Sequence, residues 1–353
     1  MNAINLKATL EIAAVAVTLL GTAAWAAPLS PATLRVIPAS VHQIISVDYG
    51  TAKKSASAMA LKAQALPENL RAFESALKDI GINPDKDLES LTFVSVGNEK
   101  DGFTMVALAS GSFSSKLVLK QTELQKVRAV KYYDCDVYAM PLKPVPSTST
   151  SRESKLHPMN MTFLADNTLL FGDDSALRAV VNTRAGNTGT IESDRNFMDS
   201  IFSVEEAPVW SALDQQGAQN MLLEAMGDDA NKLVGYQGIK NMVLSSRYSV
   251  KFDEGVKLDL HILTQDSDIS AGLASLLKAG VLYRKVTKTA AQRDALENMT
   301  VTSEHSDLQM QFKADPKQFQ NLLRTRYFGA LSGEQRPESS SGTTTALVAG
   351  SAH

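Results

Sequence analysis

Residues 242–264 read MVLSSRYSVKFDEGVKLDLHILT and carry the clearest structural pattern in the chain. Apolar and polar residues alternate along 242–252 and again along 256–264, which is typical of strands with one buried face. Asp253-Glu254-Gly255 separates the two runs and has the composition of a tight turn. The stretch therefore predicts an antiparallel β-hairpin.

Similar strand signals occur on both sides of this hairpin, and helical periodicities lie between them. The clearest helix is predicted at Glu68–Ile80, because Leu70, Phe73, Leu77 and Ile80 recur at spacings of three and four residues. Further strands are predicted at 41–48, 91–96, 103–109, 127–140, 161–164, 168–171, 298–303 and 308–313. Further helices are predicted at 55–64, 114–124, 176–183, 219–226, 230–233, 269–285 and 316–327.

Two parts of the chain repeat one order of elements: strand, helices, hairpin, helix, hairpin. The predicted fold class is therefore α+β, with two similar units of antiparallel sheet and packed helices, an internal duplication. The expected organisation is a signal peptide at 1–26, a first unit at 27–142, a Ser/Thr/Pro-rich loop at 143–158, a connecting hairpin and helix at 159–206, a second unit at 207–332 and a disordered tail at 333–353.

The composition is that of an ordinary globular protein. The 353 residues are 44% hydrophobic and 21% charged, and 35 basic against 38 acidic side chains give a net charge of −3. This composition argues against a collagen-like, wholly disordered or multi-span membrane protein. The charge balance supplies no broad basic surface, so nucleic acid is not an expected partner.

The N-terminal residues predict export. Lys7 precedes an apolar run of nine residues, Ile12–Leu20, and Ala24 and Ala26 then form the A-x-A pattern that signal peptidase reads, with cleavage after Ala26. Nine apolar residues are about half of the ~20 that span a membrane as a helix. We expect a periplasmic or extracellular protein; the alternative is a membrane tether through an uncleaved leader.

Cys135 is the single cysteine, so no intrachain disulfide can form. A nucleophile or an intermolecular bridge is the functional interpretation. The flanking Asp134 and Asp136 would raise the pKa of the thiol, which disfavours a nucleophile. We therefore interpret Cys135 as a small apolar residue of a strand.

Four stretches together resemble a group of exported bacterial proteins of unknown function from acidobacteria-like genomes. They are GINPDKDL at 81–88, YDCDVY at 133–138, LADNTLLFGDD at 164–174 and APVW at 207–210. The resemblance implies export and α+β architecture, and it brings no substrate, cofactor or catalytic residue.

The sequence contains none of the common catalytic motifs. The five histidines His42, His157, His261, His305 and His353 are spread singly, without H-E-x-x-H or C-x-x-C, so neither a metal site nor a cofactor is expected. G-x-S-x-G and the glycine-rich phosphate-binding motifs are also absent. Alternation along 258–263 places His261 on one face with Asp259 and Leu263, opposite Leu258, Leu260 and Ile262, which predicts a solvent-facing strand histidine.

Acidic residues near 166–174 are the weak catalytic candidates: Asp166, Asp173 and Asp174. Asp173 and Asp174 come just before a predicted helix, where carboxylates favour the helix N-terminus. Capping by Asp174 or Ser175 is the structural interpretation, and it is favoured over an acid–base role.

These observations lead to one main functional hypothesis. It is an exported, non-catalytic binding or scaffold protein of the cell envelope, whose partner is an unknown envelope protein or a small ligand. The alternative is an exported hydrolase with an active site assembled from dispersed residues.

Overall fold

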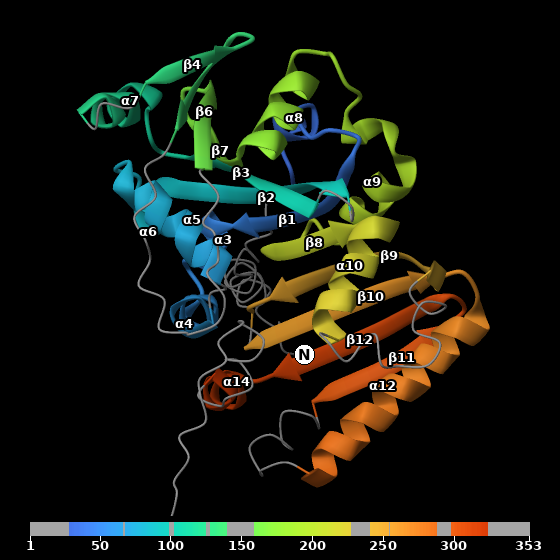
Figure 1. The fold of residues 1–353 in the computed structure, drawn as a ribbon. Coiled ribbons are helices and arrows are strands. Elements are labelled where there is room, and N and C mark those ends of the chain that lie inside the picture. The colour runs from blue at the N-terminus through green and yellow to red at the C-terminus, as the bar shows by residue number, and fades with distance from the viewer. Residues whose placement is uncertain are drawn as a thin grey trace, which may run out of the picture.

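The computed structural model describes residues 28–65, 68–98, 102–124, 128–139, 159–226, 241–253, 255–287 and 298–323. These residues form an α+β fold around one antiparallel sheet of twelve strands (Figure 1). The strand order is β11-β12-β10-β9-β8-β1-β2-β3-β7-β6-β5-β4. The strand directions rotate steadily from β6 and β7 to β11, which is the ordinary twist of a large sheet.

The strands are β1 (Val41–Asp48), β2 (Leu88–Asn98), β3 (Gly102–Gly111), β4 (Ala129–Tyr132), β5 (Cys135–Ala139), β6 (Met159–Ala165), β7 (Thr168–Asp173), β8 (Val209–Leu213), β9 (Val243–Lys251), β10 (Val256–Thr264), β11 (Met299–Glu304) and β12 (Asp307–Ala314). The helices are α2 (Pro31–Leu34), α3 (Tyr49–Ala52), α4 (Ala56–Ala65), α5 (Glu68–Asp79), α6 (Pro84–Asp87), α7 (Ser115–Leu124), α8 (Asp174–Arg184), α9 (Arg195–Phe202), α10 (Gln215–Met226), α12 (Ser267–Thr287) and α14 (Pro316–Leu323), with a 3-10 turn η1 (Ile191–Ser193).

The sheet is continuous across the boundary expected at residue 207. Strand β1 pairs with β8 in the middle, where Ile45 lies opposite Ser211. From this pair the order runs β2, β3, β7 in one direction and β9, β10, β12 in the other. We call strands β1 to β7 the β1–β7 half and strands β8 to β12 the β8–β12 half. The similar strand order accords with two related units, and the duplication itself stays a prediction.

The segment 159–206, expected as a connector, is part of the β1–β7 half. Strand β7 pairs with β3 and with β6, so it lies inside the sheet. Buried apolar residues run continuously through β7 at Leu169, Leu170 and Phe171, as in a strand covered on both faces.

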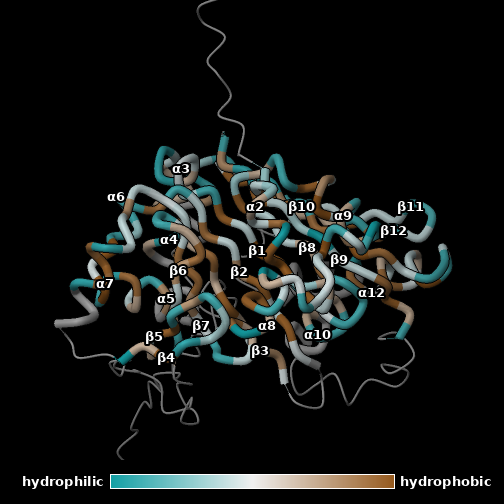
Figure 2. The backbone as a smooth tube through the Cα atoms, turned by 90° about the horizontal axis from the view of Figure 1, so that it is seen from above, coloured by the Kyte–Doolittle hydropathy of each residue, from teal (hydrophilic) through white to brown (hydrophobic). Residues whose placement is uncertain are grey.

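Helices cover both faces of the β1–β7 half. On one face, here the α8 face, Ile44, Val94 and Val106 pack with buried residues of α8 and α9. On the opposite face, the α5 face, Phe93 and Phe171 pack with Phe73 and other residues of α5. The hydrophobic segments accordingly concentrate in the central strands, and hydrophilic segments lie at the periphery (Figure 2).

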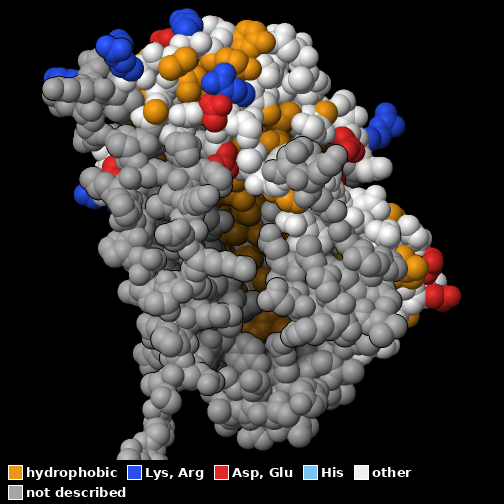
Figure 3. Space-filling model, in the orientation of Figure 1, with side chains coloured by type: hydrophobic (Ala, Val, Ile, Leu, Met, Phe, Trp, Pro, Cys, Tyr) orange, Lys and Arg blue, Asp and Glu red, His pale blue; other side chains and the backbone are white. Residues whose placement is uncertain are grey.

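Helix α9 packs against β8 on the α8 face, whereas α10, α12 and α14 pack against the β8–β12 half on the α5 face. Helix α10 packs there through Ala218, α12 through Ala274 and α14 through Phe319. Between these helices Leu258 and Phe312 are only partly buried. Apolar side chains also gather in a band over this part of the molecule (Figure 3).

Most predicted elements are present within two or three residues of their expected ends, including the hairpin of β9 and β10. Helix α9 was not predicted, because it has only eight residues and follows a 3-10 turn. The sequence nevertheless contains a signal for its start, because Asp194 is the N-cap residue and its carboxylate accepts from the Phe197 N–H (3.0 Å). The predicted leader, the loop 143–158, the helix 230–233 and the tail 333–353 lie outside the described residues.

No helix in the described part of the chain is both long and apolar enough to cross a membrane.

Candidate functional site

A cavity of about 760 Å³ lies between α2 and the α8 face of the β1–β7 half. Five strands (β1, β2, β3, β6 and β7) supply its floor, the segment 28–36 its roof, and α3 with the end of α8 its rim. The side chains that define it are Ser46, Asp48, Lys53, Lys54, Glu89, Ser90, Thr92, Leu108, Ser110, Leu164, Thr168 and Arg184. Its volume is within the range of small-ligand sites.

Hydroxyl groups dominate the floor. Ser90, Ser110 and Thr168 are register neighbours on β2, β3 and β7, and Ser46 lies opposite Thr92 on β1 and β2. The Oγ atoms of Ser90 and Ser110 are 2.6 Å apart. Each hydroxyl donates one hydrogen bond and accepts others, so this floor suits a ligand with several polar groups.

The roof is a short helix fixed at both ends. Ser30 caps α2 through its Oγ, which accepts from the Thr33 N–H (3.1 Å), and Pro31 occupies the first turn. Leu29 and Val36 pack against the core beneath α8 and α9. The segment then continues into the fully buried Ile37, whose carbonyl accepts from the Ile191 N–H (2.9 Å).

The rim carries charges of both signs. Asp48 caps α3 by accepting from the Thr51 N–H (2.9 Å) and the Thr51 hydroxyl (2.8 Å). Lys53 donates to the Leu88 carbonyl (3.3 Å), which fixes its ammonium group beside β2. Lys54 and Glu89 complete the rim, so a ligand meets both a cation and an anion there.

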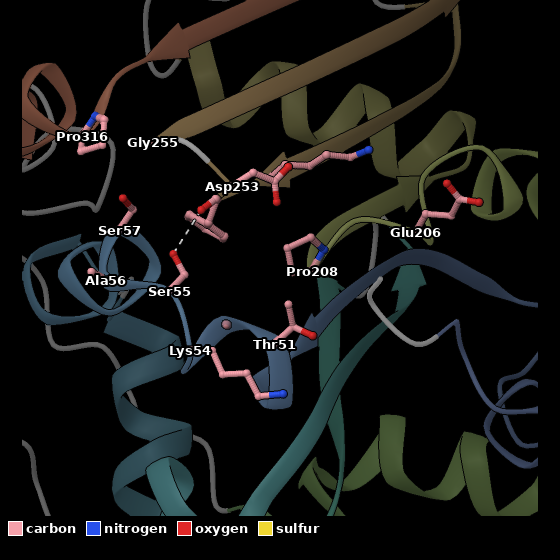
Figure 4. A pocket seen from close by; sticks show the side chains of 13 residues that line it. Thr51, Lys54, Ser55, Ala56, Ser57, Glu206, Pro208, Asp253, Gly255 and Pro316 are labelled. Carbon is pink, nitrogen blue, oxygen red and sulfur yellow. Dashed lines mark hydrogen bonds between the residues drawn. The ribbon is translucent and has the colours of Figure 1, made fainter. Parts of the chain in front are cut away.

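A second cavity, of about 720 Å³, adjoins the first and shares Thr51 and Lys54 with it. Figure 4 shows the start of α4 facing the turn between β9 and β10, with Glu206 and Pro208 on a third side. Ser55 joins two of these walls, because its hydroxyl donates to the Phe252 carbonyl (3.3 Å). This cavity therefore lies where the two halves of the sheet meet.

The structure separates the weak catalytic candidates. Asp166 lies in the turn between β6 and β7, whereas Asp173 and Asp174 lie at the other end of β7. The Ser115 hydroxyl and N–H donate to Asp166, and these bonds lower the pKa of its carboxyl. Asp166 thus fixes the start of α7.

The expected capping at α8 is wrong in detail. Asp173 occupies the N-cap position but makes no capping bond; its carboxylate accepts from the Met105 N–H of β3 (2.8 Å). Asp174 accepts from the Arg178 guanidinium (2.7 Å) and the Asn160 amide (2.7 Å). Both carboxylates therefore have structural partners.

Sequence reasoning missed the pair His42–Asp214. Nδ1 of His42 is 2.7 Å from the Asp214 carboxylate, and Nε2 is 2.8 Å from the Gly97 carbonyl oxygen. Both partners are acceptors, so these contacts favour the protonated form of the ring, in which both nitrogens donate. The Asp214 hydrogen bond raises the pKa of His42 despite the opposing effect of burial. A ring held in this way joins β1, β2 and β8 and has no nitrogen left to act as a base.

His261 lies on the face of β10 opposite Leu258 and Ile262, as expected, but it is less exposed than a solvent-facing side chain. Its side chain is 23% exposed, and Nδ1 is 2.9 Å from Asp307, which Arg247 also approaches (3.6 Å). The sequence places Asp307 in the turn after the predicted strand 298–303, and the strand register brings it diagonally across from His261.

Cys135 is buried at the start of β5, as expected. Burial raises the pKa of its thiol, and the Arg184 guanidinium, 3.1 Å from Sγ, opposes that shift. No group of three or more His, Cys, Asp or Glu side chains suited to a metal ion occurs among the described residues.

Comparisons with known proteins identify no family for the chain. No family model matches it, and no curated protein matches it. One solved structure, crystal form I of TP0453, is similar over 85% of this chain and 97% of that chain, with 11% sequence identity and a TM-score of 0.46.

Proposed function

We propose that this chain is an exported, non-catalytic binding protein of the cell envelope that holds a small polar ligand in the cavity under α2. The observation that carries the proposal is the hydroxyl-lined floor of a cavity of about 760 Å³. Strand faces beneath helices are ordinarily apolar, and on this same face Val94, Val106 and Leu170 are buried against α8. Polar side chains at Ser46, Ser90 and Ser110 are therefore a local departure from core composition.

The contacts of the described histidines favour binding over catalysis. His42 uses both ring nitrogens on acceptors, and Nδ1 of His261 faces Asp307. A general base needs a free nitrogen within hydrogen-bond reach of the proton that it abstracts. Neither imidazole ring has a serine, threonine or cysteine side chain among its hydrogen-bond partners in the described residues.

The test is a thermal-shift screen of residues 27–353 against pentoses, hexoses, polyols and free amino acids, followed by native mass spectrometry of each hit. A ligand at a hundred times its Kd stabilises the protein by about 2.7 kcal/mol. We expect Ser110→Leu, which fills the floor, to abolish the shift. Ser245→Leu is the matched control, because Ser245 is a half-buried serine of β9 outside the cavity.

Two results would contradict the proposal. One is a hit that binds equally well to the Ser110→Leu variant, which would place the ligand elsewhere. The other is turnover of a hit to a new mass, which would support the alternative of a dispersed hydrolase site.

A further inference from the structure

Three lysines lie side by side on the α8 face of the β8–β12 half. Lys257 of β10 is the register partner of Lys251 on β9 and of Lys313 on β12. Residues directly opposite on antiparallel strands point to the same face, with Cβ atoms about 4.5–5.5 Å apart. Lys257 shares its face with Asp259, which belongs to the row of register neighbours that starts at Trp210. We call Lys251, Lys257 and Lys313 the lysine row.

The positive charge of the lysine row is only partly balanced. Lys257 contacts the Asp259 carboxylate at 2.9 Å, but within the described part of the chain neither Lys251 nor Lys313 forms an ion pair. Lys257 and Lys313 are exposed, and Lys251 is partly exposed. Like charges directly opposite each other on a sheet destabilise it. An anion bound between the lysines would remove this repulsion.

The carboxylates around the lysine row limit the size of that anion. Asp259, Asp307 and Glu304 lie on the same face, farther along the strands. On the other side, Asp253 and Asp315 follow the ends of β9 and β12. A membrane or a nucleic acid laid on this face would meet these carboxylates and be repelled. Two strand spacings separate the outer lysine backbones by about 10 Å, so flexible side chains can converge on one small anion.

The lysine row ends at the second cavity, of about 720 Å³. Lys251 lines this cavity from β9, and Lys54 lines it from the segment between α3 and α4 (Figure 4). Thr51 and Ser57 contribute hydroxyl groups to the walls, and Glu206 contributes a carboxylate. The cavity therefore offers polar contacts and room for the organic part of a ligand whose anionic group lies on the row.

We propose that the lysine row binds the phosphate groups of a small phosphorylated ligand, whose remaining part enters the second cavity. Each ammonium group has three donors, and charge-assisted hydrogen bonds to phosphate oxygens are strong. The site is separate from the cavity under α2, so this proposal does not depend on the function proposed for that cavity.

The test is calorimetric titration of the purified protein with inorganic pyrophosphate, at an ionic strength held constant with sodium chloride. We expect saturable binding by the wild type and about tenfold weaker binding by Lys313→Gln, which loses one charge-assisted contact. Lys131→Gln is the matched control, because Lys131 is an exposed strand lysine on β4, at the far end of the sheet. Absence of saturable binding, or equal affinities of wild type and Lys313→Gln, would overturn the proposal.

A second variant tests the row by a gain of affinity. Oδ2 of Asp259 contacts Lys257, and Oδ1 has no hydrogen-bond partner among the described residues. Asp259→Asn frees Lys257 for the anion and should strengthen pyrophosphate binding about two- to fivefold. Weaker or unchanged binding would contradict the assignment of Lys257 to the site. Ser110→Leu, in the cavity under α2, should leave pyrophosphate binding unchanged.

Two further comparisons test the kind of ligand. A hexose phosphate should bind more tightly than inorganic phosphate, and Ser57→Leu, which fills the second cavity, should abolish that difference. Equal affinities for the two compounds in the wild type would refute the role of the cavity. Binding to phosphatidylglycerol vesicles that is lost in Lys313→Gln would assign the row to a lipid surface and overturn the proposal of a small ligand.

Discussion

The two halves of the sheet share a strand order but differ in how they use the α8 face. A single row of register neighbours crosses both halves through Trp210, which is 2% exposed. Towards β7 the row continues through Ser46, Thr92 and Leu108, all beneath the helices or the cavity roof. Towards β12 it continues through Ser249, Asp259 and Gln311.

This difference follows from what covers each half. In the β1–β7 half both faces are covered, so polar side chains on the α8 face either pair with one another or line a cavity. In the β8–β12 half the same face carries charged groups that pair laterally, such as Lys257 with Asp259 (2.9 Å). Equivalent positions in one sheet thus line a cavity in one half and carry ion pairs in the other.

The largest expected effect compares one phenylalanine from each half. Phe171 on β7 is fully buried, whereas Phe312 on β12 is only partly buried, and both lie on the α5 face. Phe171→Ala should destabilise the protein by about 3–5 kcal/mol and Phe312→Ala by about half as much. Urea unfolding of both variants checks this, and equal losses would show that the two halves are equally well packed.

The next prediction concerns the pair His42–Asp214 at the centre of the sheet. The pKa of folded His42 is raised above the unfolded value of 6.5, chiefly by Asp214. Its stabilisation is therefore fully present below about pH 6.5 and is lost as pH rises through the folded pKa. His42→Gln should remove about 1.5 kcal/mol at pH 6 and less at pH 9.

The free energies of unfolding of the wild type and of His42→Gln, measured at pH 6 and pH 9, test this prediction. His305→Gln is the control, since His305 is exposed in the turn between β11 and β12. A loss that is the same at pH 6 and pH 9 would mean that the charge of His42 is not involved.

A smaller effect on stability is expected at α9, which packs on the α8 face of the sheet. Asp194→Ala removes the cap of α9 and should cost about 1 kcal/mol. Asp199→Ala, at an exposed position on the same helix, should change stability by less than about 0.5 kcal/mol. Thermal unfolding of both variants measures these losses. If Asp199→Ala destabilises the protein more than Asp194→Ala does, α9 does not depend on its cap.

The smallest effect on stability is expected on the α8 face of the β8–β12 half. Asp307→Asn weakens the contacts with His261 and Arg247 and should cost under about 1 kcal/mol, because these groups are partly solvated. The loss should shrink further in high salt. Chemical unfolding at low and high salt measures it, and a loss above that of His42→Gln would invert the ranking of the two halves.

The same contrast explains how far the sequence predicted the structure. The hairpin of β9 and β10 could be predicted because apolar and polar residues alternate clearly in strands whose two faces have different surroundings. The pair His42–Asp214 was not readable, because its partners are 172 residues apart and meet only when β1 pairs with β8. The cavity floor escaped notice as well, since Ser46, Ser90 and Ser110 look like ordinary solvent-facing strand positions until α2 covers them.

The pairing of β1 with β8 has a kinetic consequence. Gln43 and Ser211, whose side chains bond across this pair at 3.3 Å, are 168 residues apart. Joining them closes a very long loop, and contacts of such high sequence separation slow folding. Until β8 arrives, one edge of β1 has unpaired backbone groups, which invite pairing with other chains. The period between synthesis of β1 and synthesis of β8 is therefore the interval in which this protein most needs protection from aggregation.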